Sequence, residues 1–294
     1  MPTRREILRR EVGEKLRLEA QVKPAIRRIF RRVVDEFRIT VARTGLPQSA
    51  SKYRTQFQTM MEDHYRKVQN AFSGAILLHN NADQFVELRR KQVEEEESDI
   101  EELILAMFLL WREQHSLSQA DIIAGTTQRD MQDAVNQARA ELNRQGQPTD
   151  SRSVAAAASV ILSRKLRERV DLIAVTETQA AAEAAKAIEA SATARIPIPG
   201  IPVPTDVVPI IEPAITPAVT RELRKGWLDL RDDRVRETHL IAGRTYQAAP
   251  IPINSPFIVG GFRMMYPGDT SQCAPVREIA NCRCSATYTV GVSR

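Results

Sequence analysis

The spacing of apolar residues predicts a long helix near the start of the chain, over residues 4–43. Large apolar side chains recur there at intervals of three and four residues, which places them on one stripe of a helix. These residues are Ile26, Phe30, Val33, Phe37 and Val41. A similar stripe is expected earlier in the same helix, formed by Leu8, Val12 and Leu16. Gly45 and Pro47 follow the pattern and predict its end.

The same periodicity predicts four further helices. We place them over residues 51–78, 82–114, 119–145 and 151–192. The first of them carries an apolar face that we interpret as core between packed helices, made of Tyr53, Phe57, Met60, His64, Val68 and Phe72. Ser118 is the expected N-cap of the third, because its hydroxyl can accept a free backbone N–H, and Gly125 is a candidate interruption.

The pattern changes after the last predicted helix. Residues 196–217 hold seven prolines that alternate with Ile and Val. This favours an extended arm packed on the protein's own surface or on a neighbouring subunit. Beyond it, short apolar runs separated by Gly, Pro, Asn and Asp predict strands. They lie within residues 221–230, 244–253, 261–267 and 282–290.

The predicted fold class is α+β, with a long-helix-rich N-terminal region followed by a small mixed α+β C-terminal domain. The low aromatic share of 5% agrees with a mainly helical chain, and the hydrophobic share of 43% suffices for a core. We expect a helical region with a basic first helix, helices leading into the C-terminal domain, the Pro-rich arm and the α+β domain. Their boundaries are residues 1–118, 119–195, 196–220 and 221–294.

Basic residues are concentrated at the N-terminus. Residues 1–43 hold 13 Lys and Arg against 6 Asp and Glu, in a chain of net charge +5. Because neutralising phosphates releases counterions, this helix is a candidate for non-specific DNA contact, although a solvated helix face explains the charge equally well. The candidate DNA-binding residues are Arg4, Arg5, Arg9, Arg10, Arg27, Arg28, Arg31 and Arg32. The acidic run at 94–102 indicates a second surface, for solvent or a basic partner.

Cysteine usage and apolar run length bound the expected compartment. All three cysteines fall in the last 22 residues, and an odd number does not make a disulfide framework, so a reducing environment is expected. The charged N-terminus lacks the apolar region of a signal peptide. The longest strongly apolar run, residues 103–111, is too short to cross a bilayer. We therefore expect a soluble protein made in the cytoplasm, with no membrane partner.

The most specific motifs lie in the C-terminal part. In chain order they are VTET at 175–178, Trp227, DDRVRETH at 232–239, Gly243, YPGD at 266–269 and NCRC at 281–284. This ordered set resembles the Mu F-like minor head protein family of tailed phages, also called head morphogenesis proteins, over about residues 120–294. The Pro-rich stretch departs from the family pattern, which commonly has a shorter connection there. The residues that carry the resemblance are Glu177, Trp227, Asp232, Arg234, Arg236, His239, Gly243, Tyr266, Gly268, Asp269, Asn281, Cys282, Arg283 and Cys284.

The resemblance implies a structural virion component with no catalytic residues. Such a protein joins the head during assembly, in several copies around the portal, and some members bind DNA and affect its ejection. The implied partners are the portal protein, other head and capsid proteins, and double-stranded DNA without sequence preference. The implied location is the head interior or the portal region of the virion.

One interpretation of the motif residues is a buried ionic network. The planar, permanently charged guanidinium of Arg234 or Arg236 matches a carboxylate. Asp232 or Glu177 could supply that carboxylate across the small domain. The network would fix the long helix against the sheet.

The other interpretation is a metal site. Cys282 and Cys284 stand two apart, so on a strand their side chains would point to one face. His239, together with Cys273 or Asp269, could complete a tetrahedral shell. Structural zinc sites usually show two paired-cysteine motifs and this chain has one, so we predict no cofactor and leave zinc open.

An enzyme is the rival functional class. A zinc-dependent hydrolase or nuclease, or a toxin-like effector, could be built on Asp232, His239 and the cysteines. The chain has no Gly-rich phosphate loop, no HExxH and no G-x-S-x-G motif. We therefore expect no catalysis.

Overall fold

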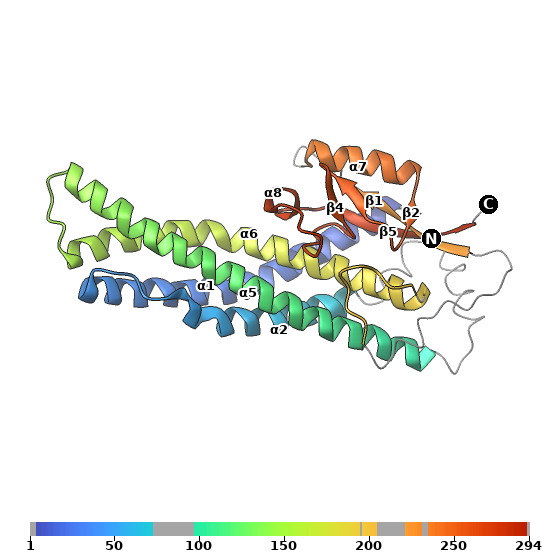
Figure 1. The fold of residues 1–294 in the computed structure, drawn as a ribbon, viewed down its shortest axis with the longest axis horizontal. Helices are drawn as coiled ribbons and strands as arrows, with labels where there is room; N and C mark the ends of the chain where they lie inside the picture. Colours follow the sequence, from blue (N-terminus) through green and yellow to red (C-terminus); the bar gives the residue numbers. More distant parts are fainter. Residues whose placement is uncertain (1–3, 73–96, 195, 205–220, 231–234, 293–294) are drawn as a thin grey trace. The chain divides into compact units, whose positions relative to one another are not determined.

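The computed structural model describes residues 4–72, 97–194, 196–204, 221–230 and 235–292. Its long helices are α1 (Arg4–Thr44), α2 (Arg54–Phe72), α5 (Glu97–Arg144) and α6 (Ser151–Ala194) (Figure 1). Two compact units are present. Unit 1 comprises Met1–Leu18, Tyr65–Arg112 and Val175–Arg294, and unit 2 comprises Glu19–His64 and Glu113–Ala174. Each long helix contributes residues to both units.

Unit 2 is helical, and its interior contains the predicted stripe of α1. All five residues of that stripe are buried, from Ile26 to Val41, so the prediction is confirmed. The rings of Phe30 and Phe57 pack edge to face with centroids 5.7 Å apart. A short 3-10 helix, η1 (Ala50–Tyr53), leads into α2. On α2 the structure buries Met61 in place of the expected Met60, which is half-buried.

The helix break expected at Ser118 was wrong. Helix α5 runs without interruption from Glu97 to Arg144, through Ser118 and Gly125, and the expected boundary at residue 118 falls inside it. Both residues are exposed, and one exposed helical glycine costs only about 1 kcal/mol. The buried side chains of Met131 and Val135 continue the helical stripe beyond that point. Their burial outweighs the local preference for a cap.

The second half of α6 is buried on all sides in unit 1. Every residue from Glu177 to Ile188 is buried. Half of them are alanines, whose small side chains let neighbouring elements approach the helix backbone from several directions. A helix that is buried all round is expected in the centre of its unit. Its few polar side chains must therefore find partners inside the protein.

The small α+β part of unit 1 follows α6 and the arm. Strands β1 (Arg221–Leu228), β2 (Ile251–Pro252) and β5 (Ser285–Val292) form an antiparallel sheet in the order β2-β1-β5. A hairpin of β3 (Phe257–Val259) and β4 (Phe262–Met264) lies beside helices α7 (Glu237–Ala248) and α8 (Val276–Ile279) (Figure 1). The chain is therefore α+β, as predicted. The core of this part includes Trp227, Phe257, Met264, Cys282 and Cys284.

The strand expected over residues 244–253 was largely wrong. Helix α7 continues to Ala248, and only Ile251 and Pro252 pair with β1. The inward-facing residues are His239, Ala242, Gly243 and Tyr246, at the three- and four-residue spacing of a helix. That spacing begins before residue 244, so the segment alone did not reveal it.

The expected apolar stripe of Leu8, Val12 and Leu16 was also wrong. Leu16 is 52% exposed and Val12 is half-buried, while the side chain of Leu8 lies outside the described residues. Glu11 and Lys15 face inward instead. The partners of Glu11 and Lys15 are charged or polar, as described below. The hydrophobic pattern of the sequence therefore does not reveal this buried face of α1.

The first part of the Pro-rich arm packs on its own unit. Ile198 and Ile201 are buried, and the turn between them places Gly200 at a φ of 83°. A Cβ at Gly200 would lie 2.0 Å from the hydroxyl oxygen of Ser271. Residues 205–217 of the arm lie outside the described residues.

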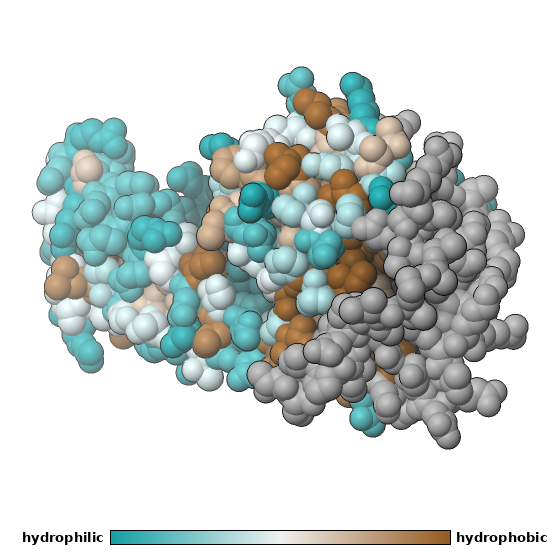
Figure 2. Space-filling model, turned by 45° about the vertical axis from the view of Figure 1, so that its right-hand side comes forward, coloured by the Kyte–Doolittle hydropathy of each residue, from teal (hydrophilic) through white to brown (hydrophobic). Residues whose placement is uncertain are grey.

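The visible surface mixes apolar and hydrophilic side chains. Figure 2 shows small groups of apolar residues separated by hydrophilic ones on the face drawn. In the small α+β part, the exposed large apolar side chains include Ile241, Ile258 and Val276. Among the helices that the structure describes, none has an apolar stretch long enough to cross a membrane.

Candidate functional site

Three of the sequence-predicted metal ligands meet inside unit 1. His239 lies on α7, and Cys282 and Cys284 lie in the loop between α8 and β5. The Nδ1 atom of His239 is 3.4 Å from Sγ of Cys284 and 3.6 Å from Sγ of Cys282. Their ligand atoms all lie within 4.8 Å of one another. Each residue is at most 2% exposed, so the cluster is enclosed by protein.

The strand argument that grouped the two cysteines was wrong in detail. Cys282 and Cys284 precede β5 and do not lie on it. They are nevertheless both buried, with Arg283 half-buried between them, because the loop alternates as extended backbone does. In the described part of the chain the cluster does not include the other expected ligands. Asp269 accepts hydrogen bonds from its own turn, and Cys273 is exposed.

Two further polar groups surround the cluster. Oε2 of Glu278, on α8, lies 3.4 Å from Nε2 of His239 and accepts a hydrogen bond of 2.9 Å from the hydroxyl of Thr238. The indole of Trp227 packs edge to face with the His239 ring, with centroids 5.4 Å apart. The indole of Trp227 belongs to the same buried core cluster as Cys284, and its N–H has no hydrogen-bond partner among the described residues. The imidazole thus has a carboxylate and an indole as neighbours.

The thiols of Cys282 and Cys284 differ in acidity. A hydrogen bond from the Cys284 thiol lowers the pKa of Cys282 to about 5, burial opposes this, and His239 adds to the lowering. The same hydrogen bond raises the pKa of Cys284 well above its ordinary value, and burial adds to the increase. Of the two thiols, Cys282 is therefore the more acidic.

Motif residues hold the cysteine loop in shape. Asn281 has a φ of 55°, in the left-handed region that asparagine tolerates better than most residues. The backbone N–H of Cys282 then donates to the carbonyl of Ile279 over 3.2 Å. The guanidinium of Arg236 donates to the carbonyl of Ala280. Both contacts fix the approach to the first cysteine.

Helix α6 contacts the same loop from its buried half. Nε2 of Gln179 donates to the carbonyl oxygen of Cys284 over 2.6 Å. The backbone N–H of Asn281 donates weakly to the hydroxyl of Thr176 over 3.4 Å. The VTET helix and the NCRC loop, 105 residues apart in both contacts, are therefore neighbours.

The predicted ionic network is described only in part. The carboxylate of Glu177 accepts a hydrogen bond of 2.5 Å from the hydroxyl of Tyr65. Arg236 donates to the backbone carbonyl described above. Asp232 and Arg234 lie outside the described residues. Pairing between these acidic and basic motif residues stays a prediction.

The YPGD motif forms a tight turn. The N–H of Asp269 donates to the carbonyl of Tyr266 over 3.1 Å, and Gly268 has a φ of 85°, which a side chain would strain. The Asp269 carboxylate accepts the N–H of Met265 over 2.8 Å. The hydroxyl of Tyr266 accepts the indole N–H of Trp111 over 3.2 Å, joining the turn to α5. The motif is thus accounted for by backbone geometry and packing.

Sequence reasoning missed a buried charge network between α1, α6 and β5. The ammonium of Lys15 lies 2.8 Å from Glu183, and the ammonium of Lys186 lies 2.8 Å from the same carboxylate. Lys186 also lies 3.4 Å from Glu11. The hydroxyl of Ser285 donates to Glu11 over 2.8 Å. Burial lowers the pKa of Lys15, but Glu183 and Glu11 outweigh it and the net pKa is raised.

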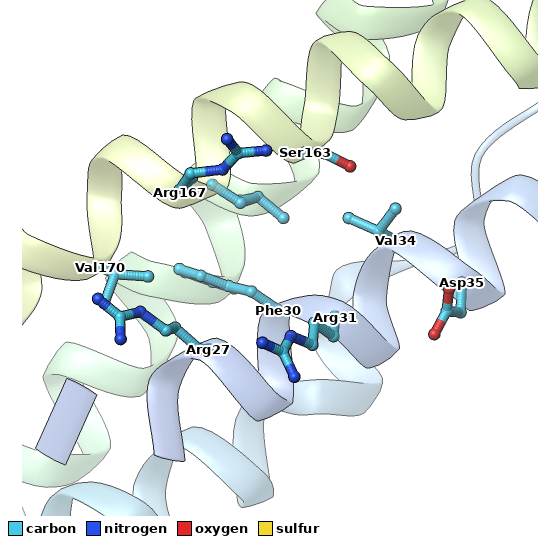
Figure 3. Close-up of a pocket in the computed structure, with 9 residues that line it drawn as sticks. Arg27, Phe30, Arg31, Val34, Asp35, Ser163, Arg167 and Val170 are labelled. Atoms are coloured by element: carbon cyan, nitrogen blue, oxygen red, sulfur yellow. The ribbon is translucent and has the colours of Figure 1, made fainter. Parts of the chain in front are cut away.

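A basic groove of about 720 Å³ lies in unit 2, between α1 and α6. Figure 3 shows Arg27 and Arg31 projecting from α1, and Arg167 from α6, around the ring of Phe30. The carboxylate of Asp35 is the acidic group in its lining. Arg167 was not among the predicted DNA-binding residues. Its place could be inferred only once the packing of α6 on α1 was known.

The other predicted DNA-binding arginines do not share this groove. Arg28 and Arg32 are exposed on an adjacent face of α1, and Nε of Arg32 donates to Glu36 over 2.9 Å. Arg9 and Arg10 are exposed in the part of α1 that belongs to unit 1. The side chains of two more lie outside the described residues; these are Arg4 and Arg5.

The chain thus offers two sites of different chemistry. One is the buried cluster of imidazole and thiols in unit 1, whose atoms suit a soft metal ion. The other is the arginine groove of unit 2, whose guanidinium groups suit phosphate or carboxylate. Comparisons with protein-family models, curated proteins and solved structures find no match to this chain.

Proposed function

We propose that the chain is a minor head protein of a tailed double-stranded DNA phage, a structural component that contacts the portal and the packaged DNA. The observation that carries this proposal is the mutual packing of the motif residues. The helix with VTET, the NCRC loop and the histidine of the DDRVRETH segment are in contact around the His239 cluster. The motifs behind the resemblance therefore belong to one framework.

The burial of this framework supports a structural role over an enzymatic one. A hydrolase would need its nucleophile, base or metal to reach a substrate. His239, Cys282 and Cys284 are each at most 2% exposed. Their hydrogen bonds and those of the YPGD turn connect elements of unit 1 to one another. We therefore do not carry the hydrolase alternative forward.

The arginine groove supports a role in DNA contact. Arg27, Arg31 and Arg167 present three guanidinium groups against the single carboxylate of Asp35. Guanidinium binds phosphate through paired N–H donors, and contacts of this kind carry no sequence preference. Packaged DNA in a phage head would be bound regardless of its sequence, as the proposed function requires.

Particles from a host that produces this phage test the head assignment. We expect the chain to sediment with DNA-filled heads in a density gradient, at a few copies per particle by quantitative mass spectrometry. Chemical cross-linking of the heads should join it to the portal protein. Absence of the chain from purified heads and from assembly intermediates would refute the assignment.

The DNA contact is tested with full-length variants, since Glu11 and Lys15 lie in the buried network and deleting the N-terminal helix would disturb the fold. Replacing Arg27, Arg31 and Arg167 together by Gln should weaken binding to a random duplex. The slope of log K against log salt is negative, and each lost phosphate contact should make it shallower by about 0.9.

A matched triple variant controls for net charge. It replaces three exposed arginines of unit 2 that do not line the groove, and these are Arg43, Arg129 and Arg152. Equal affinities and equal salt slopes for the two triple variants would show that the groove is not the DNA surface.

A further inference from the structure

We propose that His239, Cys282 and Cys284 bind one zinc ion, which ties the loop before β5 to helix α7. The inference rests on the geometry of the three side chains and their neighbours. It does not depend on the proposed role in a phage head. It goes beyond that role by giving the small α+β part a metal-dependent stability.

The distances between the ligand atoms fit a tetrahedral ion. Zinc lies about 2.3 Å from thiolate sulfur and about 2.0–2.1 Å from imidazole nitrogen, so a tetrahedral angle separates N and S by about 3.6 Å. The two observed separations from Nδ1 of His239 are 3.4 Å and 3.6 Å. The imidazole nitrogen thus lies at the distance from each sulfur that a shared ion needs, and all three ligand atoms lie within 4.8 Å of one another.

The surroundings of the ligands fit a metal as well. If Nδ1 of His239 binds the ion, Nε2 must carry the proton, and the carboxylate of Glu278 lies 3.4 Å from that atom. A carboxylate behind a ligating imidazole fixes the orientation of the ring and increases its basicity. The indole of Trp227 is buried in the same core cluster as Cys284, and its unpartnered N–H is a donor that a metal-bound thiolate could accept.

Two polar atoms gain a role from the ion. Among the described buried side chains, Nε2 of His239 and Nε1 of Trp227 have no hydrogen-bond partner of normal geometry. Unpaired buried N–H groups cost free energy. Zinc bound at Nδ1 would place the proton of His239 on Nε2, facing the carboxylate of Glu278, and metal-bound thiolates would be acceptors in the core cluster that holds Trp227.

The ligand set selects the class of metal. Two thiolates and one imidazole favour zinc over magnesium or calcium, which prefer oxygen ligands. The thiolates balance the charge of the ion, and binding releases thiol protons to solvent. Three protein ligands leave the fourth position of the tetrahedron for a water molecule, enclosed with the ion because each ligand residue is at most 2% exposed.

Elemental analysis of the full chain, purified under reducing conditions without chelator, tests the site. We expect one zinc per chain in the wild type and in Cys273→Ser, whose exposed thiol lies outside the cluster. Cys282→Ser and Cys284→Ser should each lose most of the zinc. Glu278→Gln should keep the ligands but weaken affinity by about 10- to 100-fold in competition with a chromophoric chelator.

A measurement on the wild type protects the test from variants that fail to fold. Cobalt(II) added to the zinc-depleted chain should give a thiolate-to-cobalt charge-transfer band and the strong visible bands of a tetrahedral site. Lack of both stoichiometric zinc and the charge-transfer band in the wild type would overturn the proposal. Equal zinc content in Cys282→Ser and Cys273→Ser would do the same.

Discussion

The carboxylate of Asp229 occupies the space beside Gly243 where any other residue would carry its Cβ. An added Cβ would lie 1.9 Å from Oδ2 of Asp229, far inside contact distance. Asp229 follows β1, and Gly243 lies on α7, so the missing side chain sets how closely the helix approaches the end of the strand. This contact explains why the motif has a glycine four residues after His239.

Gly243→Ala should therefore destabilise the protein, although alanine favours helices. Forcing extra volume into a packed site costs about 1–3 kcal/mol, more than the gain in helix propensity. Urea unfolding followed by circular dichroism measures the difference in free energy of unfolding.

The matched control is Gly13→Ala, also in a helix of unit 1. A Cβ at Gly13 would meet no atom within 4 Å, so this variant should gain about 0.5–1 kcal/mol. Equal effects of the two substitutions would mean that Asp229 moves aside without cost.

Lys225 should make stability depend on pH. It is fully buried, its ammonium donates to the carbonyl of Met265 over 2.6 Å, and burial lowers its pKa to about 7 although Asp269 opposes the shift. Between that value and the ordinary value of 10.5, the unfolded state binds more protons than the folded state. Stability should therefore rise with pH across this window, by up to about 1.4 kcal/mol per unit.

The test compares wild type with Lys225→Met in urea at pH 7, 8 and 9. Methionine has similar length and does not titrate, so the variant should lose this part of the pH slope. Other titrating groups act on both proteins alike and cancel in the difference. Parallel slopes would contradict the lowered pKa of Lys225.

Glu183→Gln should be among the most destabilising conservative substitutions. Its carboxylate pairs with the buried ammonium groups of Lys15 and Lys186, and removing one partner of a buried ion pair costs about 3–5 kcal/mol. Glu14→Gln removes a surface pair with Arg17 and should cost less than about 1 kcal/mol. Similar unfolding free energies for the two variants would indicate that the network is not formed in solution.

The three thiols should react at different rates in the native protein. Cys273 is exposed, whereas Cys282 and Cys284 are at most 2% exposed. A thiol reagent should modify one cysteine quickly and the other two only when the protein opens, although Cys282 has a pKa lowered to about 5. Mass spectrometry of timed samples identifies the modified residues. Fast modification of Cys282 would show that the cluster is accessible.

The sequence was informative where burial follows a regular spacing. The stripe from Ile26 to Val41 is apolar because its partners are apolar, so periodicity alone reveals it. Glu11 and Lys15 fill the equivalent inward positions earlier in α1, but their partners are charged and lie on α6 and β5. No local pattern distinguishes such a face from one exposed to solvent.

The candidate site was predictable in its ligands but not in its surroundings. Histidine and cysteine are rare, and the C-x-C spacing singles out Cys282 and Cys284, so His239 completes a short list of soft ligands. Glu278 and Trp227 act through positions set by α8 and β1. Their residue types alone say nothing about a metal.

Unit 1 is assembled from three separate stretches of the chain, and this affects the order of events during synthesis. Glu11 and Ser285, which share a hydrogen bond, are 274 positions apart. The charged face of α1 can therefore pair with Glu183 and Lys186 once α6 is made, but its contact with Ser285 must wait for β5. Both stretches of unit 2 are synthesised before strand β5, since the later one ends at Ala174. Translation thus leaves the part of this face that contacts β5 open to chaperones, or to early capture by other nascent chains, until strand β5 arrives.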